Sequence, residues 1–231
     1  MSMRIAIYFA PAPGSALEAF GCGWLGRALD GTPLAQPAVS GIDPWRLFEI
    51  TRSPRHYGFH GTLKAPFALA AGKSPDALDE AVEAFVRGRV PFEITLEVGS
   101  LGGFIALVPA TSSAPLDALA AGCVEAFDRF RAPLDEAEIA RRRASGLRPR
   151  QDRHLLRYGY PYVLDDFRFH MTLTERLQPP ERDRVLAILA ERAAPICARP
   201  VTIDAIAIFE QPSREAPFTL RRRFPLGQVA A

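Results

Sequence analysis

One short pattern occurs twice in this chain, at positions 60 and 170, and it constrains the fold more than any other feature of the sequence. The segment His60-Gly61-Thr62-Leu63 resembles His170-Met171-Thr172-Leu173, and a phenylalanine precedes each. Each segment lies in a short apolar run typical of a strand. Side chains two residues apart on a strand point to the same side. We therefore expect each histidine to share a face with the threonine that follows it, and the two pairs to face each other across one cleft.

The order of the predicted elements around the two segments also recurs: strand, helix, irregular segment, histidine strand, helix, strand. We interpret residues 1–231 as a single bilobal domain of two pseudo-repeats, about 4–100 and 104–225, with a helical insertion at about 133–157. The expected fold class is α+β, an internally duplicated fold in which two mainly antiparallel sheets line a central cleft and the helices lie outside.

Local signals give the expected boundaries of the elements. Ser15, with Glu18 three residues later, indicates a helix start, and Gly31 indicates its end. Residues 32–57 are rich in Pro and Gly and are expected to be irregular, with one turn of helix at 44–48. The remaining expected helices are 75–87, 114–130 and 180–193, and the expected strands are 4–10, 58–64, 92–98, 104–108, 167–174, 201–209 and 218–225.

The charge of the chain is nearly balanced overall but uneven along its length. A formal net charge of +2 is too small to indicate a nucleic-acid coat or a membrane patch by itself. Two interpretations of the crowded arginines stay open: solvated faces, or a rim that attracts an anionic substrate. These arginines are Arg141, Arg142, Arg143, Arg148, Arg150, Arg153 and Arg157 in one stretch, and Arg221, Arg222 and Arg223 in another.

The three cysteines, Cys22, Cys123 and Cys197, are far apart and form no CxxC pair, so neither a zinc knuckle nor a disulfide framework is indicated. This cysteine usage is typical of a reducing compartment. The apolar run within Met1–Pro11 is too short for a signal peptide or a membrane span. We therefore expect a cytoplasmic protein that does not associate with a membrane, and we take a monomer as the default.

Two histidines with adjacent hydroxyls suit acid–base chemistry on a phosphate ester. An imidazole titrates near neutral pH, so one ring can accept a proton while the other donates one. A threonine hydroxyl can donate a hydrogen bond to a phosphate oxygen. Two alternatives stay open: a module that binds an RNA end or a nucleotide without cleaving it, and a metal-dependent hydrolase in which Asp165 and Asp166 join the histidines.

The two motifs resemble those of the two-histidine phosphoesterase superfamily, which has two His-x-(Ser/Thr)-x segments in a duplicated fold and includes RNA end-processing cyclic phosphodiesterases. The segments 57–67, 157–162 and 167–174 resemble a branch found with phosphonate (carbon–phosphorus lyase) genes and labelled as a domain of unknown function (1045-like). The resemblance covers nearly the whole chain. It implies a phosphodiesterase without metal or cofactor that acts on a small cyclic phosphodiester or nucleotide, such as a ribose cyclic phosphate.

By that resemblance, His60 and His170 are the catalytic acid–base pair, and Thr62 and Thr172 bind the phosphate. Lys64 falls on the same strand face as His60 and can reach a phosphate, or it can be a strand-end lysine in solvent. His56 and His154 lack a threonine partner and are interpreted as surface or packing residues. The further candidates for substrate contact are Tyr57, Tyr158, Tyr160, Arg52 and Arg55.

Overall fold

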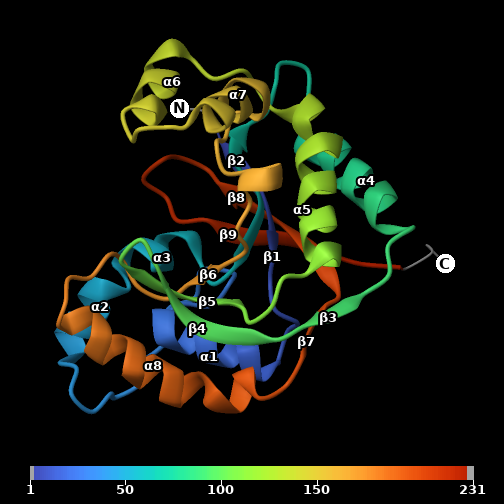
Figure 1. Cartoon of the computed structure of the whole chain (residues 1–231). Coiled ribbons are helices and arrows are strands. Elements are labelled where there is room, and N and C mark those ends of the chain that lie inside the picture. Colours follow the sequence, from blue (N-terminus) through green and yellow to red (C-terminus); the bar gives the residue numbers. More distant parts are fainter. Residues whose placement is uncertain (1–2, 228–231) are drawn as a thin grey trace.

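A sheet of seven antiparallel strands runs through the computed structural model, which describes residues 3–227 (Figure 1). A separate two-stranded ribbon pairs β3 (Phe92–Ile94) with β7 (Val201–Ile203). The predicted α+β class with mainly antiparallel sheets is confirmed. In spatial order, the large sheet consists of β4 (Leu96–Leu101), β5 (Phe104–Pro109), β6 (Met171–Thr172), β2 (Gly61–Ala68), β1 (Arg4–Phe9), β8 (Ala205–Gln211) and β9 (Thr219–Pro225).

The helices form three groups in Figure 1: α4 with α5, the group α1, α2, α3 and α8, and the pair α6 and α7 at one end of the molecule. Two short 3-10 turns, η1 (Asp128–Phe130) and η2 (Leu164–Asp166), follow α5 and α7 along the chain. The helices are α1 (Ala16–Leu25), α2 (Pro44–Ile50), α3 (Arg52–Tyr57), α4 (Pro75–Val86), α5 (Ala114–Ala126), α6 (Glu136–Arg143), α7 (Pro149–Tyr158) and α8 (Glu181–Cys197).

The strand order of the large sheet is symmetric about the contact between β6 and β2. Moving outward from that contact, β5 and β1 come next, and then β4 and β8. The two strands of the small ribbon also correspond, because β3 directly precedes β4 in the chain and β7 directly precedes β8. This symmetry is what two pseudo-repeats would produce, with β9 added at one edge. The division of the chain into pseudo-repeats stays a prediction.

Two helix starts lie where the sequence predicts them. The Ser15 hydroxyl accepts a hydrogen bond from Glu18 N at 3.1 Å, and the Ser74 hydroxyl accepts one from Ala77 N at 3.1 Å. The predicted end of the first helix at Gly31 is wrong. The helix ends at Leu25 because Gly26 adopts a left-handed conformation with φ 72°, which leaves its N–H bonded to the last carbonyls of the helix.

The expected single strands 92–98 and 201–209 are each two strands in two different sheets. The breaks fall at Thr95 and Asp204, where the chain leaves the β3–β7 ribbon and enters the large sheet. In the sequence, apolar residues continue at every second position across both breaks, so the periodicity alone does not reveal them. The expected irregular segment 32–57 contains α2 and the unpredicted helix α3, and the second histidine strand is only Met171–Thr172.

The phenylalanine before each histidine packs into a space that a glycine leaves open. A Cβ added at Gly21 of α1 would lie 2.1 Å from the ring of Phe59, and one added at Gly61 would lie 2.3 Å from the ring of Phe169. Both rings are buried, and they belong to the same hydrophobic core. These two glycine–phenylalanine contacts fix the position of the backbone immediately before each histidine.

Substitution of the glycines of α1 tests this packing. We expect Gly21→Ala to destabilise the protein by about 1–3 kcal/mol, because the new methyl group overlaps Phe59. Gly23→Ala, in the same helix but with nothing within 4 Å of the added Cβ, should stabilise it by about 0.5–1 kcal/mol. Denaturant midpoints measure both effects, and equal midpoints for the two variants would contradict the account.

Candidate active site formed by two neighbouring strands

The pairing of β2 with β6 brings the two histidine motifs together. Gly61 lies opposite Met171 in this antiparallel pair, so His60 lies opposite Thr172 and Thr62 lies opposite His170. Alternation along each strand places these four side chains on one face. The motifs therefore lie side by side on adjacent strands of one sheet. This arrangement corrects the expectation that the two pairs face each other across a cleft between lobes.

Both motifs line a single cavity of about 490 Å³. No aspartate or glutamate lies among the described residues of its wall. Four arginines, four further aromatic or imidazole side chains and several small residues complete it. The lining comprises His60, Thr62, His170, Thr172, Arg4, Arg141, Arg142, Arg214, Tyr8, Tyr57, Tyr160, His56, Ser53, Pro54, Gly58, Ala65 and Pro66.

The hydrogen bonds of His60 define its tautomer. Its Nδ1 lies 2.9 Å from the carbonyl oxygen of Gly58, which can only accept, so Nδ1 carries the proton. Its Nε2 then accepts from the Thr62 hydroxyl at 3.1 Å. The ring also stacks on Tyr8 with centroids 3.6 Å apart. Burial lowers the pKa of His60 to about 4, although the bond to Gly58 raises it and His170 lowers it further.

His170 is held in a similar way. Its Nδ1 donates to the carbonyl oxygen of Arg168 at 2.7 Å, which leaves Nε2 as the acceptor nitrogen of the neutral ring. The ring of Phe104 lies 5.5 Å from the imidazole, centroid to centroid. Burial lowers the pKa of His170, against the opposing effect of the bond to Arg168. Each imidazole is thus fixed through Nδ1 by the carbonyl two residues earlier, and its Nε2 carries the lone pair.

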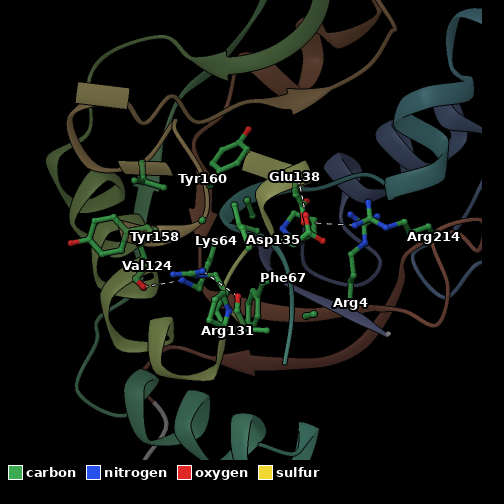
Figure 2. A pocket seen from close by; sticks show the side chains of 18 residues that line it. Arg4, Lys64, Phe67, Val124, Arg131, Asp135, Glu138, Tyr158, Tyr160 and Arg214 are labelled. Atoms are coloured by element: carbon green, nitrogen blue, oxygen red, sulfur yellow. Dashed lines mark hydrogen bonds and ion pairs between the residues drawn. The ribbon is translucent and has the colours of Figure 1, made fainter. Parts of the chain in front are cut away.

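Lys64 does not line the histidine cavity, which corrects its expected placement. Ile7 pairs with Lys64 and Tyr8 pairs with Thr62, so β2 has an irregularity at Leu63 that turns Lys64 to the opposite face. Lys64 is 4% exposed and donates to Val124 O at 3.0 Å (Figure 2). Its Nζ also lies 3.4 Å from Asp128 Oδ1. Burial lowers its pKa to about 8. It lines a neighbouring cavity of about 300 Å³.

Among the other candidates, Tyr57 and Tyr160 line the histidine cavity, whereas Tyr158, Arg52 and Arg55 do not. Tyr158 lines the neighbouring cavity that contains Lys64. Arg52 is exposed on α3. Arg55 has a structural role instead: its Nε donates to Leu25 O at 2.9 Å, and its guanidinium stacks on Phe48 at 3.8 Å.

The sequence did not predict several of the residues that line the cavity. Tyr8 follows Arg4 on the same face of the first predicted strand, but only the pairing of β1 with β2 places it on His60. His56, interpreted as a surface or packing residue, also lines the cavity, and its Nε2 accepts from Gln211 Nε2 at 3.0 Å. Arg214 lies between β8 and β9 and carried no sequence signal.

Asp166 is committed to ion pairs. Its carboxylate accepts from Arg148 at 2.6 Å and from Arg150 at 2.7 Å. Within residues 3–227, no three His, Cys, Asp or Glu side chains gather into a group that could hold a metal ion.

Over the same span, no helix combines the length and the apolar character needed to cross a bilayer.

Comparison with known proteins shows which proteins this chain is similar to. Two curated relatives, from Janthinobacterium sp. (strain Marseille) and Laribacter hongkongensis (strain HLHK9), carry the name ribose 1,5-bisphosphate phosphokinase PhnN. The first is 39% identical over 231 residues, with 96% of this chain and 50% of the relative covered. The second is 35% identical over 222 residues, with 95% and 51% covered. The chain thus spans about half the length of the curated relatives it matches.

Among solved structures, E. coli LigT complexed with 3'-AMP aligns with 99% of this chain and 100% of its own, with a TM-score of 0.47 and 11% sequence identity. Residues 62–219 match the family model described as "Protein of unknown function (DUF1045)", which covers more than half of the chain. The chain belongs to the DUF1045 family, as the resemblance of its two motifs predicted.

Proposed function

We propose that this protein is a phosphodiesterase that opens a cyclic phosphodiester, with His60 and His170 as its acid–base pair. One observation carries the proposal: two imidazoles immediately before the adjacent strands β2 and β6, and two hydroxyls within those strands, line one cavity. Both rings are fixed through Nδ1, so that Nε2 is the nitrogen that exchanges protons. A positioned proton acceptor and a positioned proton donor are the groups that in-line displacement at phosphorus needs.

In the proposed reaction, Nε2 of His60 takes a proton from the attacking water, and the water oxygen forms a bond to phosphorus. The bond from phosphorus to one ring oxygen breaks, and protonated Nε2 of His170 donates its proton to that oxygen. The product is a phosphomonoester with a free hydroxyl group. We assign the base to His60 because its lower pKa keeps it neutral. When the substrate binds, the Thr62 hydroxyl turns from Nε2 of His60 to a non-bridging oxygen, which frees Nε2 for the water, and the Thr172 hydroxyl donates to the other non-bridging oxygen.

We propose a ribose cyclic phosphate as the substrate and a reaction without a metal ion. The name of the curated relatives refers to a phosphorylated ribose, although those proteins are about twice as long. We do not assign their phosphokinase activity to this chain. Its Gly72-Lys73-Ser74 has Phe67 where a phosphate-binding loop has its first glycine, and the Ser74 hydroxyl caps α4.

Removal of either imidazole tests the assignment. We expect His60→Ala and His170→Ala each to lower kcat about 10²–10⁴-fold, because general acid–base catalysis contributes about that much. The assay is phosphorus NMR of ribose and nucleoside cyclic phosphates with chelator present. His154→Gln is the matched control, because His154 lies outside the cavity. Full activity in either alanine variant, with circular dichroism unchanged, would refute the assignment, and loss of activity in chelator would refute the metal-free reaction.

The pH dependence follows from the two lowered pKa values. Catalysis needs neutral His60, whose pKa is about 4, and protonated His170, whose pKa is below the ordinary 6.5. We therefore expect kcat/KM to rise with pH through about 4 and to fall before pH 6.5. NMR titration of the imidazole protons assigns each limb. An optimum of kcat/KM above pH 7, or an unshifted His60, would contradict this prediction.

The threonines should matter less than the histidines. A hydrogen bond to a charged group is worth about 1.5–3 kcal/mol, so Thr62→Val and Thr172→Val should each lower kcat/KM by about 10- to 100-fold. Thr62→Ser and Thr172→Ser keep the hydroxyl and should recover most of the loss. Unchanged kinetics in both valine variants would remove the phosphate-binding role.

A further inference from the structure

A third imidazole lines the cavity of His60 and His170, and the proposed reaction does not use it. His56 lies in the last turn of α3 and contributes to the same wall. An imidazole can accept a proton, donate one, or serve only as a hydrogen-bond donor, depending on which nitrogen carries the proton and on what the other nitrogen contacts. The partners of His56 therefore decide what it can do for a bound substrate.

Gln211 determines which nitrogen of His56 carries the proton. Gln211 is the last residue of β8, and it is completely buried. Its Oε1 accepts a hydrogen bond from Arg4 Nε at 2.7 Å, and its Nε2 donates one to Ala216 O at 2.7 Å. A flipped amide is excluded, because a guanidinium can only donate and a carbonyl can only accept. The Gln211 atom that lies 3.0 Å from His56 Nε2 is therefore the amide nitrogen.

The neutral ring of His56 accordingly carries its proton on Nδ1. An amide nitrogen cannot accept a hydrogen bond, so Nε2 of His56 accepts from Gln211. Among the described residues, the Nδ1–H group has no hydrogen-bond partner. His60 and His170 show the opposite arrangement, because their Nδ1–H groups are bonded to carbonyl oxygens. The two catalytic rings thus keep Nε2 for proton exchange, whereas His56 has an N–H group left for a ligand.

The surroundings of His56 keep it neutral. Burial lowers its pKa, and the positive charges of Arg27 and Arg4 lower the pKa further. Protonation of Nε2 would also set two N–H groups against each other, since Gln211 cannot turn its amide without losing its hydrogen bond to Arg4. The ring of Tyr57 lies 5.4 Å away, edge to face, and no carboxylate lines the cavity within the described residues. His56 can therefore donate a hydrogen bond without exchanging a proton.

We infer that His56 is a substrate-binding residue whose Nδ1–H donates a hydrogen bond to an oxygen of the substrate, and that Gln211 is the positioning residue that holds His56 in this tautomer. The inference rests on the proposed phosphodiesterase function and adds to it a third imidazole, which binds the substrate and takes no part in proton transfer. A phosphoryl oxygen and a sugar hydroxyl share the required chemistry, a lone pair on oxygen. A pair of substrates, one of them without any hydroxyl group, distinguishes the two sources.

Imidazole NMR of the protein without substrate tests the tautomer directly. We expect His56 to carry its proton on Nδ1 and to be mostly neutral at pH 6.5, the pKa of an ordinary histidine. Gln211→Glu replaces the amide donor with a carboxylate, so Nε2 of His56 should become protonated and the pKa of the ring should rise. A proton on Nε2 in the unmodified protein, or an unchanged pKa in Gln211→Glu, would overturn the inference.

The kinetic experiment compares a ribose cyclic phosphate with ethylene cyclic phosphate, which has no hydroxyl group and serves as substrate or competitive inhibitor. His56→Leu removes the donor, and His56→Asn places an amide N–H close to the position of Nδ1. We expect His56→Leu to lower kcat/KM on the ribose compound about 3- to 100-fold, the loss of one hydrogen bond, with most of the change in KM. His56→Asn should recover most of the loss.

The pattern of losses identifies the acceptor oxygen. Weaker interaction of His56→Leu with both compounds indicates a phosphoryl oxygen, and a loss on the ribose compound alone indicates a hydroxyl group. His154→Leu is the matched control, because it removes an imidazole that does not line the cavity, and its kinetics should not change. Equal losses in His56→Leu and His56→Asn would overturn the inference, and so would unchanged kinetics of His56→Leu on both compounds.

Calorimetry separates the inference from the proposed function, because it needs no turnover. If the unmodified protein hydrolyses neither compound, the phosphodiesterase proposal fails, and the ribose cyclic phosphate becomes a stable ligand. At least threefold weaker binding of this compound to His56→Leu than to the unmodified protein would then still support the His56 contact. Equal binding to both proteins, or binding to neither, would refute it.

Discussion

The contact between Gly61 and Met171 is the constraint on which the rest of the site depends. It fixes the register of β2 against β6, and a shift by one residue would turn either motif away from the cavity. Behind this contact, Phe169 occupies the space that the missing side chain of Gly61 leaves. The glycine inside the first motif is therefore as necessary to the geometry as the histidine before it.

The sequence predicted the parts of the site that depend on local spacing. His60 and Thr62 share a face because they are two positions apart along an extended chain, and the same holds for His170 and Thr172. Helix α4 begins where the sequence places a serine followed by proline. Such features depend on residues close together in the chain. They can therefore be found from a single sequence without knowledge of how the strands pair.

The features that were missed depend on which strand pairs with which. Lys64 has the spacing of a cavity residue, but the irregularity where β2 meets β1 turns it toward Asp128. Thr95 and Asp204 continue the alternation of their neighbours, yet the chain changes sheets there. Arg214 lines the cavity from the loop that connects β8 with β9. None of these outcomes is encoded in the spacing of nearby residues.

The pairing of strands that are far apart in the sequence affects how the chain acquires its structure. β1, near the beginning of the chain, pairs with β8, so that Arg4 lies opposite Gln211, and β2 pairs with β6, so that Gly61 lies opposite Met171. Contacts of such long sequence separation slow folding, because loop entropy is lost before they form. Either half made alone would present unpaired strand edges that invite aggregation. The two histidine motifs therefore come together only after the segments that carry β1, β2, β6 and β8 have all been synthesised.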